Sequence, residues 1–309
     1  MFLKSIVRKL YLLLPSFFAG ITTTPEEVYY TPLSSFEPQQ LTHIQDVPSL
    51  EWLKSEVIQW KSFDGLEIEG ILTYPSGYKK GTKVPLVLWI HGGPASVSHE
   101  GIYNSRLASE GYAVFEPNYP GSLGYGKDFL RSNYKDFGGG DFKDILSGVN
   151  FLIEEGIVSS ERIVIAGWSY GGFMSAWAVA HDQRFKAAIV GAGPTNWYSF
   201  RKNPVWLMNN MGYSFKDWYK ASPVRYVKNI KTPVLVQHGD KGKTVLPGNL
   251  IELSYALKRL DVPHKSILYR GQGHDFTSPL SSLQMMSDRS EWMKSEWNGS
   301  FRKQISSVT

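Results

Sequence analysis

The residues of this sequence best suited to do chemistry are a serine in a glycine-rich turn and a histidine near the C-terminus. Ser169 is the central residue of "GWSYG" (167–171), which matches the pattern G-x-S-x-G. The run "RIVIA" precedes this stretch and "GFMSAWAVA" follows it, so the serine is expected on a tight turn between a strand and a helix. His274, in the loop "GQGHDF", comes later in the chain, where a general base is expected. The pair predicts acyl transfer through a covalent intermediate on Ser169.

A second glycine-rich turn offers donors for the negative charge that develops in acyl transfer. The stretch "HGGP" (91–94) directly follows the apolar run "VPLVLWI". Backbone N–H groups of such a loop, with that of the residue after the nucleophile, form an oxyanion hole. The predicted hole consists of the loop at His91 and Gly92, with Gly93 as an alternative donor, and of Tyr170. The same stretch also fits a tight turn at a strand end.

Strands of the buried type alternate with helical segments along most of the chain. Continuous apolar runs such as 84–90 are typical of parallel strands, and leucines recur at helical spacing across 247–260. Asp141 is expected to cap the helix after it, and "SLEWLKSEV" (49–57) to form a short helix. The alternation predicts an α/β fold of the α/β-hydrolase type, a mostly parallel central sheet with helices on both faces. The aromatic-rich segment 194–232 is expected to cover the top of the sheet.

Composition excludes several classes of site. The 309 residues are 42% hydrophobic, which is enough for a large core, and the net charge of +5 comes from scattered Lys and Arg. Scattered basic residues argue against a nucleic-acid partner. There is no cysteine, which excludes disulfides and thiolate metal sites, and no phosphate-binding or dinucleotide motif is present. No metal and no cofactor is therefore expected.

The N-terminal segment has the outline of a targeting signal. Lys4, Arg8 and Lys9 precede an apolar run from Leu10 to Ile21. The run is shorter than the roughly 20 residues of a typical membrane span, and Pro15 interrupts it. A cytoplasmic location is expected, and the alternative is export or membrane attachment through residues 1–21.

Several stretches, taken in order, resemble the prolyl oligopeptidase family of serine peptidases, especially its acylaminoacyl-peptidase and dipeptidyl-peptidase-like members. The stretches span residues 57–297 and are "DGLEIEG", "HGGP", "NYPGSLGYGKDF", "GGGDFKDILSGV", "GWSYGGFMS", "SPVRYVKNIKTPVLVQHGD" and "GHDF". The resemblance implies a hydrolase domain over 57–297, a remnant of a β-propeller end over 1–56 and a C-terminal tail over 298–309. It also implies short peptide substrates, and a homo-oligomer is left open.

The sequence departs from the family pattern at the acid that orients the base. In the family it follows His-Gly after two intervening residues, which are Asp240 and Lys241 in this chain. The acid position is then occupied by Gly242. Asp240 could serve instead, although an aspartate directly after a strand is more typical of a turn. Without an acid, turnover is expected to fall by roughly 10⁴-fold, because the imidazole loses its tautomer and counter-charge.

By resemblance, the aromatic segment walls a substrate pocket with Trp197, Tyr198 and Trp206, whereas ordinary packing is the alternative. The sequence as a whole predicts a serine-type peptidase that cleaves short peptides through an acyl-enzyme at Ser169, with His274 as general base. Weakened activity is expected from Gly242 unless Asp240 replaces the acid. A carboxylesterase-like hydrolase, and a catalytically impaired relative that only binds peptides or partner subunits, are the alternatives.

Overall fold

The computed structural model describes residues 16–21, 24–32, 34–35, 37–43, 53–98, 102–200, 204–212 and 214–297. Most of the predicted targeting segment and the whole predicted C-terminal tail lie outside these ranges. Only the last residues of the targeting segment are described, as strand β1 (Ser16–Ile21).

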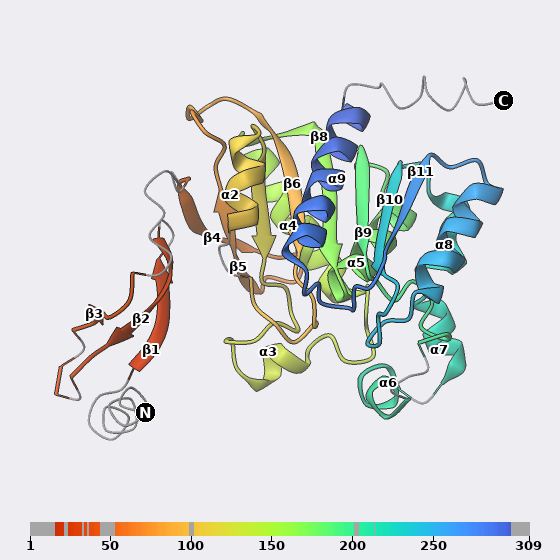
Figure 1. Ribbon diagram of the computed structural model, residues 1–309, viewed down its shortest axis with the longest axis horizontal. Helices are drawn as coiled ribbons and strands as arrows, with labels where there is room; N and C mark the ends of the chain where they lie inside the picture. Colours follow the sequence, from red (N-terminus) through yellow and green to blue (C-terminus); the bar gives the residue numbers. More distant parts are fainter. Residues whose placement is uncertain are drawn as a thin grey trace.

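An eight-stranded sheet forms the centre of the molecule (Figure 1). Its order is β11-β10-β9-β8-β6-β7-β5-β4, and the six strands from β11 to β7 are parallel. β5 and β4 extend the sheet antiparallel, and a turn that includes Asp64 and Gly65 joins them. The strands are β4 (Ser55–Lys61), β5 (Glu67–Thr73), β6 (Val84–Ile90), β7 (Ala113–Pro117), β8 (Val158–Trp168), β9 (Ala187–Gly191), β10 (Val234–Gly239) and β11 (His264–Tyr269).

Helices cover both faces of this sheet, and Figure 1 shows α2 and α9 in front of it and α4 and α5 behind. Alternate strand residues point to opposite faces, so Leu86 and Leu88 pack on one side and Val87 on the other. The predicted α/β-hydrolase architecture is confirmed. The covering helices are α2 (Ile102–Ser109), α4 (Gly140–Glu154), α5 (Tyr170–His181), α8 (Gly248–Arg259) and α9 (Pro279–Trp297).

The carboxyl ends of the parallel strands meet at one edge of the sheet, and the short helices gather there (Figure 1). In open α/β sheets this is the edge at which ligands bind. These short helices are α3 (Lys127–Arg131), α6 (Pro204–Met211) and α7 (Phe215–Lys220), whereas the 3-10 helix η1 (Pro223–Asn229) packs against α5 and α8.

Two local predictions are wrong. The helix expected over 49–57 is replaced, from Ser55 on, by β4, because Ser55 and Glu56 pair with Thr73 and Leu72 of β5. Asp141 is not the N-cap of α4, which is Gly139; instead it lies in the first turn.

A separate three-stranded antiparallel sheet precedes the large one, in the order β1-β2-β3. Its second and third strands are β2 (Thr24–Tyr30) and β3 (Gln39–Gln40). The two sheets share no strand pairing among the described residues.

Candidate active site

Ser169 occupies a strained turn between β8 and α5. Its backbone has φ 59° and ψ −118°, a conformation that side chains rarely adopt, and its N–H donates to the Gly191 carbonyl at 2.8 Å. The neighbouring glycines are required by contact: a Cβ on Gly167 would lie 2.5 Å from the Gly171 carbonyl carbon, and one on Gly171 would lie 1.9 Å from the Ile90 oxygen. The turn therefore holds the serine at the carboxyl edge of the sheet.

The loop after β6 lies directly beside this turn. A Cβ added to Gly92 would meet the Trp168 oxygen at 3.2 Å and the Ser169 Cβ at 3.4 Å. The His91 ring stacks on Tyr119 with centroids 4.4 Å apart, and its Nε2 lies 2.8 Å from the Ser122 hydroxyl, so the imidazole shapes the loop. Tyr170 begins α5, where the first N–H groups have no intrahelical acceptor. Gly92 and Tyr170 are thus both adjacent to Ser169, the two positions at which the sequence predicts the oxyanion donors.

The side chain of Tyr170 is anchored below the turn by a carboxylate that the sequence did not single out for this role. The Tyr170 hydroxyl donates to Asp141 Oδ2, while Asp141 Oδ1 accepts the N–H groups of Gly138 at 2.9 Å and Phe142 at 2.8 Å. Burial raises the pKa of Asp141 to about 7, against the three donors that lower it. In the sequence, Asp141 stands out only as part of "GGGDF", a pattern that is equally typical of the beginning of a helix.

His274 lies in the loop after β11, against the residue that precedes the nucleophile. The Trp168 indole N–H donates to the His274 carbonyl at 3.0 Å, and the two rings have centroids 6.2 Å apart. Burial lowers the pKa of His274, and the charge of Asp275 opposes this shift. The imidazole is therefore neutral near pH 7, the form in which a base can accept the serine proton.

The working hydrogen bonds of His274 are not formed in this structure. Its Nδ1 is buried without a partner, and no hydrogen bond joins its ring to the Ser169 hydroxyl within the described part of the chain. In unliganded enzymes such bonds are often long and shorten when substrate binds.

In the structure, Asp240 makes hydrogen bonds to the backbone of the turn after β11. Its Oδ1 accepts the N–H of Gly271 at 2.7 Å, and its own N–H donates to the Tyr269 carbonyl at 3.1 Å. These bonds tie the turn after β10 to the turn after β11. Asp240 therefore serves here as a turn residue, the alternative that its position after a strand favoured.

Gly242 lies against the ring of His238. A Cβ at position 242 would lie 2.6 Å from His238 Cε1 and 2.8 Å from the Val245 oxygen. His238 is 1% exposed, and its Nε2 is buried without a partner. No pattern in the sequence indicates this contact between His238 and Gly242.

The predicted pocket aromatics are in different surroundings. Trp197 is 1% exposed and packs between Phe137 and Phe173 in the core, which favours ordinary packing, the alternative to a pocket wall. Tyr198 is 42% exposed and touches Phe215 of α7. The side chain of Trp206, on α6, lies outside the described residues.

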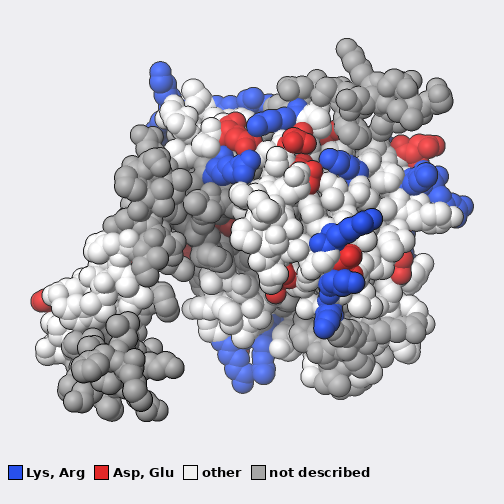
Figure 2. All heavy atoms as spheres, viewed as in Figure 1, with Lys and Arg blue, Asp and Glu red and all other residues white. Residues whose placement is uncertain are grey.

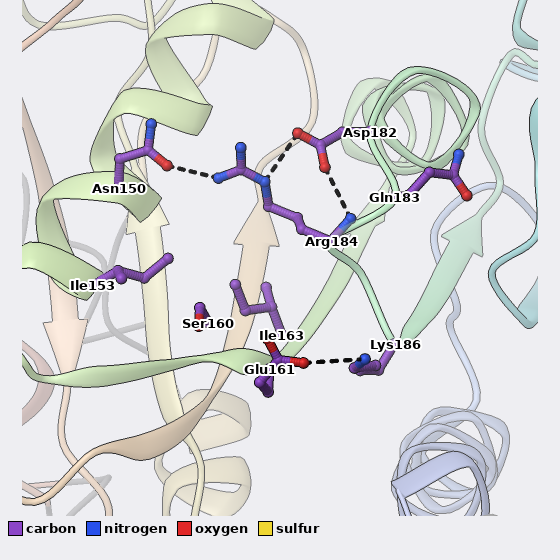
Figure 3. A pocket seen from close by; sticks show the side chains of 9 residues that line it. All are labelled: Asn150, Ile153, Ser160, Glu161, Ile163, Asp182, Gln183, Arg184 and Lys186. Carbon is purple, nitrogen blue, oxygen red and sulfur yellow. Dashed lines mark hydrogen bonds and ion pairs between the residues drawn. The ribbon is translucent and has the colours of Figure 1, made fainter.

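A polar cavity of about 430 Å³ lies elsewhere, beside the beginning of β8 (Figure 3). Its charged side chains bind one another: Arg184 pairs with Asp182 at 2.9 Å, and Lys186 with Glu161 at 3.7 Å. Ser160 lines it near the start of β8, whereas Ser169 follows the end of that strand. The cavity is therefore distinct from the serine site.

Surface charge is mixed on the face shown in Figure 2, where Lys and Arg lie among Asp and Glu. Within the described residues, no group of three or more His, Asp or Glu side chains could hold a metal ion. None of the helices described is both long and apolar enough to cross a bilayer.

The chain is similar in sequence to known peptidases. The chain is 32% identical over 299 residues to the "Uncharacterized peptidase YuxL" of Bacillus subtilis, covering 89% of this chain and 45% of that protein. It is 30% identical to dipeptidyl-peptidase 5 of Porphyromonas gingivalis, covering 72% of this chain and 35% of the relative. The chain thus spans less than half the length of these relatives.

Among solved structures, the acylaminoacyl peptidase of Pyrococcus horikoshii superposes with a TM-score of 0.84 at 28% identity. The match covers 92% of this chain and 48% of that one. The model of the prolyl oligopeptidase family matches residues 101–300, which include Ser169, His274 and position 242. The chain therefore belongs to the prolyl oligopeptidase family.

Proposed function

We propose that this chain is a serine-type peptidase that hydrolyses short peptides through an acyl-enzyme at Ser169. The observation that carries the proposal is the strained Ser169 turn, flanked by the Gly92 loop and by the His274 loop that Trp168 holds. The named relatives, a peptidase and a dipeptidyl-peptidase, support this reaction class.

Each residue of the site has its own role in this proposal. Ser169 Oγ attacks the peptide carbonyl carbon while His274 Nε2 takes its proton. The N–H groups of Tyr170 and Gly92 bind the oxyanion. When the intermediate collapses, the C–N bond breaks and the amine leaves with the proton from His274. A water molecule then hydrolyses the ester on Ser169 by the same steps.

For the domains, we propose a peptidase domain over 57–297 and the end of a β-propeller over 1–56. The separate antiparallel sheet β1-β2-β3 supports this division, and so does the partial coverage of the relatives. The site residues proposed are Ser169 and His274, with Asp240 as a turn residue. Tyr198 and Trp206 remain the proposed pocket aromatics.

A fluorophosphonate probe tests the function, because it labels only an activated serine. We expect labelling of the unaltered chain and none of Ser169→Ala. Release of the amine from short peptide amides, compared with hydrolysis of the matching esters, then separates a peptidase from a carboxylesterase. Labelling that persists in Ser169→Ala would exclude Ser169 as the nucleophile.

A second candidate function is peptide binding without turnover, and Gly242 favours it, since the residue at the acid position carries no carboxylate. In that case short peptides bind, as isothermal calorimetry can show, while the probe does not react and no amine is released.

A further inference from the structure

Two imidazole nitrogens, one on the proposed base and one on the neighbouring strand β10, are buried and have no hydrogen-bond partner. They are Nε2 of His238, on β10, and Nδ1 of His274, in the loop after β11. An unsatisfied buried polar group costs free energy, typically ~1–3 kcal/mol, so two of them in adjacent segments call for a functional explanation. A shared role for the two imidazoles rests on the proposed serine hydrolase function.

The hydrogen bond of His238 fixes its tautomer. Its Nδ1 lies 2.9 Å from the carbonyl oxygen of Gly239. A carbonyl only accepts, so Nδ1 of the neutral ring carries the proton and Nε2 presents a lone pair. The unpaired nitrogen of His238 is therefore an acceptor.

The proposed chemistry gives the unpaired ring nitrogen of His274 the opposite hydrogen-bonding role. To take the proton of Ser169, its Nε2 must present a lone pair, and the ring proton then lies on Nδ1. In serine hydrolases this N–H needs an acceptor that holds the ring in the correct tautomer. The unpaired nitrogen of His274 is therefore a donor, complementary to that of His238.

Backbone contacts bring the two segments together. A Cβ on Gly239 would lie 2.2 Å from the Gly273 oxygen, and Lys241 donates its N–H to the Gln272 carbonyl at 2.8 Å. Position 242 is where the family places its acid, and the ring of His238 lies against Gly242 in the direction that a side chain would take. The imidazole thus fills space that an acidic side chain would use.

We propose that His238 is a positioning residue that replaces the missing acid, by accepting the Nδ1–H of His274 at its own Nε2. The bond forms as His274 turns toward Ser169 on substrate binding. It fixes the tautomer of the base, but a neutral imidazole supplies no counter-charge for the imidazolium that forms. The arrangement therefore sustains catalysis at a lower rate than a carboxylate would.

Both rings are neutral near pH 7, as the arrangement requires. Burial lowers the pKa of His238, and nearby His274 lowers it further, against the bond to Gly239. From the loop after β11, Asp275 acts on His274. In the turn after β10, Asp240 is held by Gly271, and Lys241 and Lys243 are exposed.

Gln237 precedes His238 and faces the other side of β10. It receives a hydrogen bond from Arg289 and donates one to Tyr269. Tyr269 in turn donates to Asp288, so these charged groups of α9 belong to the opposite face of the sheet. Among these groups, the Arg289 guanidinium also lies over the ring of Trp168, 5.4 Å from its centroid, and Trp168 contacts His274.

The test is the rate of fluorophosphonate labelling as a function of pH, in the full chain and two His238 variants. His238→Phe keeps a ring but removes the acceptor, and a roughly 10- to 100-fold slower reaction is expected, the loss typical of a hydrogen bond to a group that becomes charged. His238→Gln places an amide oxygen near the Nε2 position, and a rate within about threefold of the unaltered chain is expected.

The pH profile separates positioning from a structural role. In the unaltered chain both imidazoles must be neutral, so the logarithm of the rate falls on the acid side with a slope approaching two. In His238→Gln only His274 titrates, and the slope falls to one. A merely structural role of His238 would change the rate or the melting temperature but not the slope.

His264→Gln is the matched control, because its Nδ1 also bonds a nearby backbone carbonyl, that of Val262 at 2.8 Å, at the opposite end of β11. It should label as the unaltered chain does. Equal rates and slopes for the unaltered chain, His238→Phe and His238→Gln would overturn the role of His238 while leaving the proposed function intact. Absence of labelling in the unaltered chain would overturn both.

Discussion

At the scale of single residues, position 242 shows that a carboxylate can be introduced there only at a cost in stability. An added Cβ comes within 3 Å of both the His238 ring and the backbone oxygen of Val245. The ring can turn aside, but the backbone must shift. The local fold is thus adapted to glycine.

The first prediction concerns Gly242→Asp. We expect it to lower the free energy of unfolding by about 1–3 kcal/mol, the usual cost of overpacking a buried position. We also expect roughly 10-fold or faster fluorophosphonate labelling, because a carboxylate then supplies the counter-charge that His238 lacks. Urea unfolding and labelling rates measure the two effects.

Gly242→Ala is its control, since it adds the same Cβ without a charge. It should lose as much stability and gain no rate. If the Asp and Ala variants react equally slowly, a carboxylate at 242 does not reach His274.

The second prediction concerns Asp141, whose pKa burial raises to about 7 from its ordinary 3.8. At pH values between about 4 and 7, Asp141 therefore keeps its proton in the folded state and has lost it in the unfolded state. The associated stability is present below about pH 4 and is lost as the pH rises through 7. Asp141→Asn mimics the protonated form, so its unfolding free energy should lack this decline.

Urea unfolding at several pH values from 4.5 to 8 measures the effect. The free energy of unfolding of Asp141→Asn should increase relative to that of the unaltered chain as the pH rises. Asp128→Asn, which removes an exposed carboxylate from α3, is the control and should follow the unaltered chain. A constant difference between Asp141→Asn and the unaltered chain at all pH values would contradict the raised pKa.

At the scale of elements, the site depends on how the loop after β11 is held against the turn after β8. Trp168 makes this link through its indole N–H, while its ring packs edge-on against Phe276 at 5.5 Å. The indole therefore positions the base from the residue next to the nucleophile.

The third prediction concerns this link. Trp168→Phe keeps an aromatic ring and removes the donor, which is worth about 0.5–1.5 kcal/mol for a typical hydrogen bond. We expect kcat to fall by roughly 2- to 10-fold as the His274 loop loosens. Steady-state kinetics on a short peptide amide provide the measurement.

Trp177→Phe on α5 is the matched control, because the indole nitrogen of Trp177 has no hydrogen-bond partner. Its kcat should stay unchanged. An equal loss in both variants would mean that ring volume, and not the hydrogen bond, matters.

Elements with a periodic or continuous apolar pattern could be predicted from the sequence, because that pattern reports which face is buried. The apolar run 84–90 coincides with β6, and Leu250, Leu253 and Leu257 are buried on α8, whereas Leu260 is 46% exposed because the helix ends at Arg259. The helix expected at 49–57 was wrong because strand pairing over long range outweighs local propensity.

The site was predictable only where a local motif carries it. The turn at Ser169 is specified by glycines within a few residues of it. The contact of His238 with Gly242, and the bond from Trp168 to His274, join segments whose proximity depends on the whole sheet. No spacing along the chain reveals which side an imidazole faces.

At the scale of the whole molecule, the described strands form two sheets that are not paired with each other. The small sheet pairs only with itself among the described residues, and the core residues of the large sheet begin with Trp60 on β4. Leu53 is partly buried against the second core cluster, so the hydrolase domain makes use of the chain from about this point on.

The fourth prediction is that removal of residues 1–51 leaves the large domain folded and reactive. No strand of the large sheet loses its partner, so the melting temperature should change by less than about 2–4 °C, which corresponds to ~1 kcal/mol for a domain of this size. Ser169 should react with the fluorophosphonate probe at an unchanged rate, since every contact described for the site lies within 57–297. Calorimetry measures the melting temperature, and labelling measures the reactivity of Ser169.

Removal of residues 1–60 is the contrasting variant, since it also deletes most of β4 together with Trp60. It should unfold or aggregate, because it exposes the edge strand β5 and the core beneath it. If the shorter deletion proves as harmful as the longer one, the small sheet stabilises the domain through contacts other than strand pairing.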